Sequence, residues 1–271
     1  MKRDYNLLKE VLSVPTETYK EEYMIQFICD WLNENNIPFE LDRYNNIYAT
    51  KQTDKDVEYF PCVISHTDTV HRIDTINVRE EMLPNAQNEL KESLKAYNDE
   101  GKPTGIGGDD KCGVYACLEL LKELPNLKAA FFVSEETGCH GSKKADRKFF
   151  SNVGYGIQFD APENWMVTEY CMGTQLFERD SDFFESCDSV LTESFQGRQK
   201  YQSHPYTDVY ALKGVFDFSC INFSIGYYDY HTKNEYVVVE DVYNGIETGK
   251  KMIEKLGYNK YEFQPKPKYF M

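Results

Sequence analysis

The 271-residue chain lacks an apolar run of the ~18 residues that a membrane-spanning helix needs. Its first ten residues, MKRDYNLLKE, are charged and contain no apolar signal core. We therefore expect neither a membrane span nor a secretory leader. Basic residues are also few, because 30 Lys and Arg face 45 Asp and Glu, a formal net charge of −15. This imbalance argues against nucleic-acid partners and against binding to anionic membrane surfaces.

The eight cysteines form no CxxC pair and are spread along the chain without the density of a disulfide scaffold. We expect buried free thiols and a cytoplasmic protein. The sequence also has no internal repeat, low-complexity run or long Gly/Ser linker that would mark a domain boundary. With 41% hydrophobic residues the chain can bury a sizeable core, and we expect residues 1–271 to form a single domain.

The hydrophobic pattern predicts an α/β fold. Apolar residues recur at helical spacing around residues 7–12, 23–32, 113–123 and 239–256. Short β-rich runs predict strands at residues 47–50, 59–65, 129–134, 155–159, 220–225 and 236–239. Strands that alternate with helices indicate a three-layer domain, in which helices cover both faces of a mixed, mostly parallel sheet. The charged, turn-rich residues 72–108 predict a long loop with one hairpin near residues 98–101.

Polar residues follow these apolar runs at the point where ligands bind in open α/β sheets, beyond the carboxyl ends of the strands. Five segments contribute such residues: His66-Thr67-Asp68, Asp109-Asp110, Glu135-Glu136, Asp160 and His231. Any one fragment is best read as structural or solvated, but five together favour a site. Carboxylates and imidazoles gathered without a counter-ion would repel one another. A pair of divalent cations removes that conflict, and ligands without thiolate favour zinc, with manganese or cobalt as alternatives.

These residues resemble the co-catalytic (dinuclear) zinc exopeptidase superfamily, and within it most of all the peptidase T family of tripeptide aminopeptidases. The motifs that carry the resemblance are His66-Thr67-Asp68-Thr69-Val70, Gly108–Gly113, Glu135-Glu136-Thr137-Gly138, Asp160, Thr207-Asp208, Asn222–Gly226, Tyr230-His231 and Glu235-Tyr236-Val237. The likeness runs with gaps from the first helix to Val238. It implies a zinc-exopeptidase fold with two Zn²⁺ ions, which hydrolyses a peptide bond at the end of short peptides.

The resemblance also implies a role for each metal ligand. Asp109 would bridge the two metal ions. His66 and Asp160 would complete one site, and Glu136 and His231 would complete the other. A short carboxylate at a loop-to-helix junction suits a bridge between ions ~3.5–4 Å apart.

Two further residues receive catalytic roles from the resemblance. Asp68 would accept the imidazole N–H of His66 and fix its tautomer. Glu135 would act as the general base that takes a proton from the attacking water and returns it to the leaving amine. The order within Glu135-Glu136 and Asp109-Asp110 rests on the family pattern, so Asp110 stays open as the alternative bridge.

The chain departs from the family pattern between Asp160 and His231. Peptidase T and its close relatives carry an inserted lid or dimerisation domain there, but residues 161–230 are too few to hold it. We therefore expect a catalytic core without a lid, and the oligomeric state stays open. The acidic, aromatic residues 171–206 take the lid's place and predict one or two helices. Weaker candidates for substrate contact are Tyr206, Tyr210, Tyr230, Thr207, Asp208, Arg179, Arg198 and Lys200.

Three functions compete. An aminopeptidase on short peptides is favoured, because a substrate with a free carboxylate would need an arginine that the sequence does not obviously supply. A carboxypeptidase or an N-acyl amino acid amidohydrolase would use the same metal chemistry. A non-catalytic binding relative is the third reading, but such chains normally lose ligands or the base, and here all of them are present.

Overall fold

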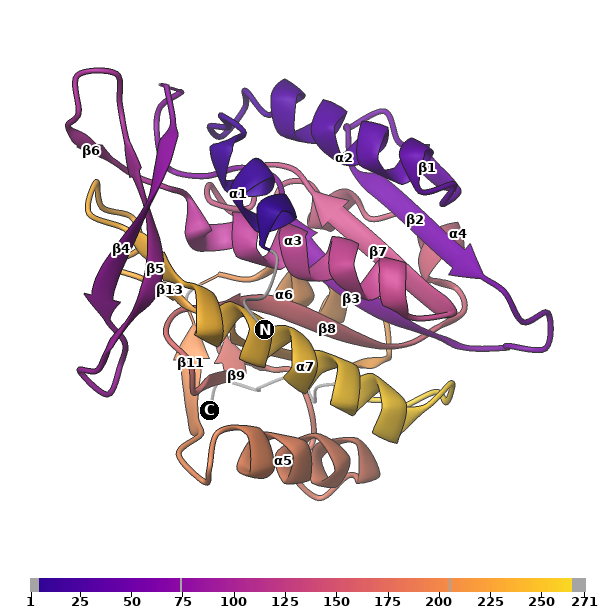
Figure 1. The fold of residues 1–271 in the computed structure, drawn as a ribbon. Coiled ribbons are helices and arrows are strands. Elements are labelled where there is room, and N and C mark those ends of the chain that lie inside the picture. The colour runs from indigo at the N-terminus through magenta and orange to yellow at the C-terminus, as the bar shows by residue number, and fades with distance from the viewer. Residues whose placement is uncertain (1–4, 74, 205, 265–271) are drawn as a thin grey trace.

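The computed structural model describes residues 5–73, 75–204 and 206–264 and places two sheets among seven α-helices in these residues (Figure 1). The larger sheet has nine strands. In spatial order they are β1 (Phe39–Leu41), β2 (Ile47–Gln52), β7 (Asn126–Phe132), β3 (Phe60–His66), β8 (Val153–Ala161), β12 (Ser219–Ser224), β9 (Met166–Cys171) and β10 (Thr174–Gln175), with β11 (Lys200–His204) paired to β9.

The centre of this sheet is parallel. β7, β3, β8 and β12 run in the same direction, whereas the pairs β1–β2, β2–β7, β12–β9 and β9–β10 are antiparallel, and β11 pairs with β9 in parallel. The register sets His66 at the end of β3 opposite Phe132 at the end of β7. The carboxyl ends of the central strands therefore meet at one edge, as the sequence predicts.

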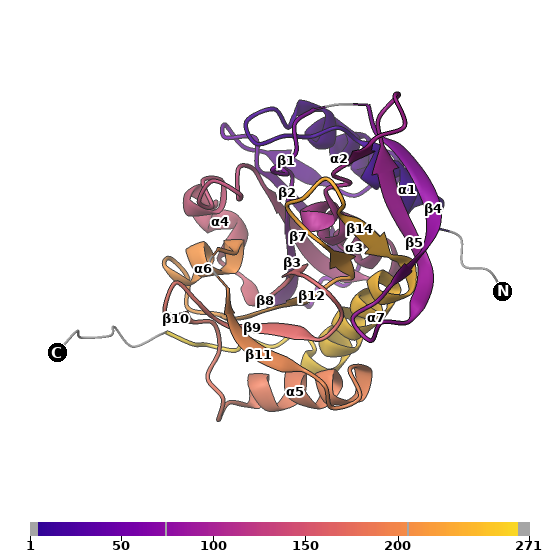
Figure 2. The same ribbon diagram turned by 90° about the vertical axis from the view of Figure 1, so that its left-hand side faces the viewer.

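The helices cover both faces of the larger sheet. They are α1 (Asn6–Ser13), α2 (Glu22–Glu34), α3 (Gly108–Glu123), α4 (Arg147–Phe150), α5 (Asp182–Ser194), α6 (Asp208–Lys213) and α7 (Val239–Leu256), with a 3₁₀ turn, η1 (Ser142–Lys144). Figures 1 and 2 show α3 and α7 on one face and α4 and α6 on the other. α1 packs on α3, and α5 packs on α7. The predicted α/β fold, a mixed sheet with helices on both faces, is confirmed.

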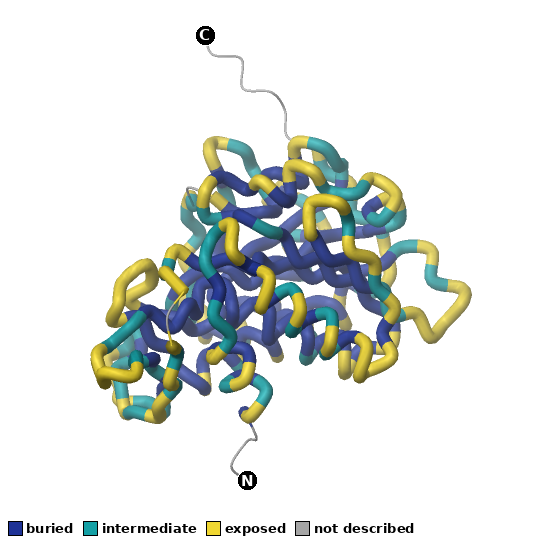
Figure 3. Tube along the Cα trace, turned by 90° about the horizontal axis from the view of Figure 1, so that it is seen from above, coloured by how far each residue is buried: buried dark blue, intermediate teal, exposed yellow. Residues whose placement is uncertain are grey.

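The core lies between these layers (Figure 3). Every residue of β3, β7, β8 and β12 is buried, as expected for central strands covered on both faces. All eight cysteines are free; seven are buried and Cys29 is partly exposed. The prediction of buried free thiols is therefore confirmed.

The prediction of a long loop over residues 72–108 is wrong. β4 (Asn77–Pro84) and β5 (Leu90–Tyr97) form a hairpin within a second, five-stranded sheet. Its order is β13 (Tyr227–Tyr228), β14 (Tyr236–Val238), β5 and β4, with β6 (Pro103–Thr104) paired to β5. β4 has exposed residues on both faces and no fully buried one, so it lacks the alternation that marks a half-buried strand. The turn near residues 98–101, which joins β5 to β6, was predicted correctly.

The segment in the position of the missing lid contains α5, followed by β11. Residues 258–264 pack beside the large sheet, where Ser219 N donates to Tyr261 O and Tyr261 N donates to Gly154 O. Residues 265–271 lie outside the described residues. Among the helices of the described segments, none has the length and apolar character needed to cross a bilayer.

Candidate metal centre

His66 forms the centre of the first half of the site. It is the last residue of β3 and is buried between β7 and β8. Its Nε2 lies 3.2 Å from Oδ1 of Asp109, 3.7 Å from Oδ1 of Asp160 and 3.8 Å from Oε2 of Glu135. Side chains from β3, β8, the turn after β7 and the start of α3 thus converge at the predicted sheet edge.

His231 forms the centre of the second half. It lies in the turn after β13, with its side chain 42% exposed. Its Nε2 is 3.2 Å from Oδ2 of Asp109 and 3.0 Å from Oε2 of Glu136. The two oxygens of Asp109 therefore face two different imidazoles, those of His66 and His231. The structure brings all five predicted ligands together.

Asp110, the alternative bridge, is also close to the site. Ligand atoms of His66, Asp110 and Asp160 lie within 4.8 Å of one another, as do those of His66, Asp109 and Glu136. However, both Asp110 oxygens already accept hydrogen bonds: Oδ2 from Ser65 Oγ (2.7 Å) and His66 N (3.2 Å), and Oδ1 from Gly113 N (3.1 Å). The oxygens of Asp109, in contrast, face the imidazoles of His66 and His231.

Asp68 is fully buried and serves both halves of the site. Its Oδ1 lies 3.3 Å from His66 Nδ1, and its backbone carbonyl lies 3.1 Å from the same nitrogen. The carboxylate also accepts the backbone N–H groups of Glu135 (2.9 Å) and Glu136 (3.3 Å), and the hydroxyl of Thr18 (2.8 Å). One side chain thus orients an imidazole and holds the turn that presents both glutamates.

Burial perturbs the carboxyl groups of the site strongly. Burial raises the pKa of Glu135 well above its usual value, and Asp160 adds to this. Burial and the charge of Asp109 raise the pKa of Glu136 to about 7. For Asp109, the effect of burial is outweighed by the neighbouring imidazoles of His231 and His66, which lower its pKa. Without cations the cluster therefore holds protons that its carboxylates would otherwise lose.

The donor set fits divalent metal ions. Nε2 of His66 is a buried atom without a hydrogen-bond partner among the described residues, although carboxylate oxygens surround it. A buried imidazole nitrogen that has no hydrogen-bond partner and is surrounded by carboxylate oxygens has the chemistry of a metal ligand. Its Nδ1 faces Asp68, the arrangement that metal-bound histidines use to fix their tautomer.

Sequence reasoning missed the amides that hold Asp160. Asn222 on β12 accepts Asp160 N at 2.8 Å and donates to Asp160 O at 2.8 Å. Gln158 donates to Asp160 Oδ2 at 3.0 Å and accepts the hydroxyl of Thr207 at 2.6 Å. The available signal was a polar side chain inside an otherwise apolar, fully buried strand, which requires a partner. Thr207 is thereby engaged in a structural contact.

The three basic candidates of the lid-replacing segment contact side chains outside the predicted ligand set. Arg179 donates two hydrogen bonds to Glu169, at 2.8 and 2.6 Å. Arg198 and Lys200 lie over the ring of Trp165, at 5.9 and 5.3 Å from its centroid. Among the tyrosines, Tyr230 packs edge-on against His231, with ring centroids 5.0 Å apart.

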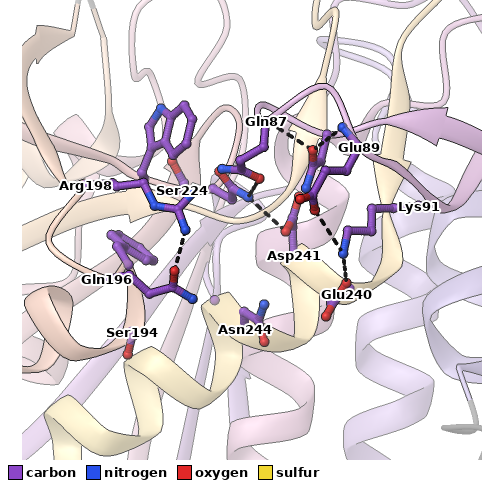
Figure 4. A pocket seen from close by; sticks show the side chains of 15 residues that line it. Gln87, Glu89, Lys91, Ser194, Gln196, Arg198, Ser224, Glu240, Asp241 and Asn244 are labelled. Carbon is purple, nitrogen blue, oxygen red and sulfur yellow. Dashed lines mark hydrogen bonds and ion pairs between the residues drawn. The ribbon is translucent and has the colours of Figure 1, made fainter.

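A cavity of about 300 Å³ lies on a different part of the surface (Figure 4). Its walls come from the β4–β5 hairpin, the β8–β9 turn, the end of α5 and the start of α7. Arg198 lines it, but no predicted metal ligand does, and neither do Asp68 and Glu135. Asp241 accepts hydrogen bonds there from Asn164 (3.0 Å) and Tyr228 (2.6 Å). This cavity is therefore distinct from the metal centre.

Comparison with solved structures shows the fold. The chain is similar to aminopeptidase PepT from Bacillus cereus, with a TM-score of 0.75, 15% identity, and coverage of 93% of this chain and 97% of that one. It is similar to a tripeptidase from Staphylococcus aureus, with a TM-score of 0.69, 13% identity, and coverage of 92% and 96%. It also resembles aminopeptidase APDkam598 from the archaeon Desulfurococcus kamchatkensis, with a TM-score of 0.64, 14% identity, and coverage of 92% and 94%.

Comparison by sequence identifies the family. The cytosol non-specific dipeptidase of Escherichia coli K12 is 20% identical over 189 residues, which are 68% of this chain but only 35% of that protein. The chain thus corresponds to about a third of the length of this relative. The model of peptidase family M20/M25/M40 matches residues 62–255, which include every predicted site residue. The chain therefore belongs to peptidase family M20/M25/M40.

Proposed function

We propose that this protein is a metal-dependent exopeptidase, an aminopeptidase that acts on short peptides in the cytoplasm. Residues 1–271 would act as one catalytic domain without a lid. The observation that carries the proposal is the carboxylate of Asp109 between the imidazoles of His66 and His231, 3.2 Å from each. The buried free thiols support a reducing compartment.

The five ligands divide between two cations. His66, Asp160 and one oxygen of Asp109 would hold the first, and His231, Glu136 and the other oxygen of Asp109 would hold the second. Zn²⁺ is the expected ion, with Mn²⁺ or Co²⁺ as alternatives. When bound, such a pair polarises the scissile carbonyl and lowers the pKa of water from 15.7 toward ~7.

Glu135 would move the proton. It is buried beside His66 but is not needed to complete either ligand set. Its raised pKa suits a group that accepts a proton from the attacking water and returns it to the leaving amine. Asp68 fixes the backbone of this residue through the hydrogen bond to its N–H, so the carboxylate is held beside the metal ligands.

The basic side chains of the lid-replacing segment support the choice of an aminopeptidase, because they are already engaged with other side chains. Arg179 is tied to Glu169, and Arg198 and Lys200 lie over Trp165. A carboxypeptidase or an N-acyl amino acid amidohydrolase would need such a cation to bind the free carboxylate of its substrate.

The test is a substrate panel with the protein reconstituted with Zn²⁺, Mn²⁺ or Co²⁺. Aminoacyl-anilides and di- and tripeptides with a free amine should be cleaved, whereas N-acyl amino acids should not. Glu135→Gln should lower kcat by about 10²–10⁴-fold while the metal content is kept. Cleavage restricted to N-acyl substrates would replace the aminopeptidase by the amidohydrolase. Metal binding without turnover of any substrate would indicate a non-catalytic binding protein.

A further inference from the structure

Glu235 is a fully buried carboxylate that has no place among the metal ligands. It precedes β14 and lies against the loop that leads into α3. Oε2 accepts the backbone N–H of Gly107 at 2.9 Å, and Oε1 accepts the N–H of Asp109 at 3.1 Å. Nε2 of His71 lies 2.6 Å from Oε2. Three donors therefore converge on one carboxylate.

Two of these donors belong to the loop that presents the bridging aspartate. The backbone of Asp109 is not helical, so the regular turns of α3 do not fix it. The two N–H groups held by Glu235 are those of Asp109 and of the residue two positions before it. Because the Glu235 carboxylate accepts both N–H groups, it fixes the orientation of the backbone at Asp109 and therefore the direction of the Asp109 side chain.

The loop packs tightly against Glu235 and His71. Gly107 has φ +69°, a conformation that favours glycine. A Cβ on Gly108 would lie 2.7 Å from Tyr227 Cβ and 3.3 Å from Oε1 of Glu235, and a Cβ on Gly105 would lie 2.0 Å from the ring of His71. Close packing of this kind prevents the loop from adopting another conformation with different hydrogen-bond partners.

We infer that Glu235 is a positioning residue for the bridging carboxylate, with His71 as its support. The Glu235 clamp, defined as Glu235 and His71, holds Asp109 so that its two oxygens face His66 and His231. The metal-binding part of this inference needs only the ligand set, whereas its catalytic part rests on the proposed function. Partners that orient a ligand typically contribute about 10–100-fold to metal affinity or activity.

The test is Glu235→Gln, which keeps the size of the side chain but turns one acceptor into a donor facing an N–H. We expect Zn²⁺ affinity, measured by competition with a chelator, to fall about 10–100-fold. With saturating metal, kcat should fall while KM changes little. The matched control is Glu240→Gln, five residues further along, whose carboxylate is 57% exposed and paired with Lys91. It should bind Zn²⁺ like the wild type.

Far-UV circular dichroism and the Tm of the metal-free protein separate positioning from folding. His71→Ala provides the measurement if Glu235→Gln does not fold, because it removes one donor and leaves the carboxylate in place. It should lower Zn²⁺ affinity by a smaller factor. Wild-type Zn²⁺ affinity and stoichiometry in the variant that folds would overturn the inference, whatever its Tm. Weakened Zn²⁺ binding in a protein that cleaves no peptide would uphold the clamp and reject the proposed function.

Discussion

The carboxylate of Asp68 accepts a hydrogen bond from the backbone N–H of Glu135 at 2.9 Å. The imidazole of His66 contacts the same carboxylate. Asp68 is therefore a shared, buried anchor for a proposed metal ligand and for the proposed base. A single change at Asp68 therefore disturbs both at once.

Asp68→Asn is the first prediction. Asparagine fits the space, but its amide group cannot accept from His66 and from the N–H groups of Glu135 and Glu136 together. We expect kcat/KM to fall about 10–100-fold, with a parallel loss of metal affinity. Both are measured on metal-titrated protein. Asp56→Asn, at an exposed position, is the control and should match the wild type. Equal activity of the two variants would contradict the shared anchor.

Removal of metal should destabilise the fold. Chelation leaves Asp109, Glu136 and Asp160 facing one another without cations, and a ligand that binds only the folded state stabilises it by mass action. We expect the Tm to fall in excess chelator and to be restored by Zn²⁺. Calorimetry with the metal content checked by elemental analysis measures the effect. An unchanged Tm after verified removal would count against the metal centre.

The metal-free protein should lose stability as the pH rises from 5 to 8. Burial raises the pKa of Asp208 from 3.8 to about 7, with Asp160 adding to it. Between these two values the folded state keeps a proton that the unfolded state has lost, so this contribution to stability falls as the pH rises above 3.8 and is gone once the pH exceeds about 7. One such group contributes a slope of up to about 1.4 kcal/mol per pH unit. Urea unfolding at several pH values should show that the free energy of unfolding of Asp208→Asn depends less steeply on pH than that of the wild type. An identical dependence would refute the raised pKa of Asp208.

Glu21 should matter for stability although it lies outside the ligand set. Its carboxylate is buried and accepts the hydroxyls of Thr67 (2.5 Å) and Ser134 (2.9 Å), which follow β3 and β7. Glu21→Ala leaves the Ser134 hydroxyl without this acceptor, which costs about 1–3 kcal/mol if water cannot reach it. The Thr67 hydroxyl keeps a second acceptor, the carbonyl of Phe132, at 3.1 Å. Urea unfolding of the metal-free protein measures the loss. The neighbouring exposed Glu22, changed to Gln, should unfold like the wild type.

Two local signals in the sequence predict the candidate metal residues: a buried apolar run and the polar residue that ends it. His66 and Asp160 were found in this way. The order of Asp109 and Asp110 needed the family resemblance, because neighbouring identical side chains differ only in the donors that surround them. Those donors, such as Ser65 and Gly113, become visible only in three dimensions.

The residues that support the site were harder to predict. Glu235 was noted only as part of a motif, because its partners Gly107 and His71 are more than a hundred residues away in the chain. The β4–β5 hairpin was missed for a related reason. Its strand β5 pairs with β14, which is more than a hundred residues further along the chain, and a local pattern cannot reveal this pairing.

Because seven thiols are buried, their reaction with a thiol reagent measures local unfolding of the protein. A small thiol-reactive dye meets only Cys29 at the surface of the folded molecule, so each additional label marks a region that has come apart. Cys139, whose Sγ lies 3.5 Å from Oε1 of Glu135, reports on the loop of the proposed base, and Cys187 reports on α5. Mass spectrometry of partly labelled protein would therefore rank the elements by their opening rates without any substitution.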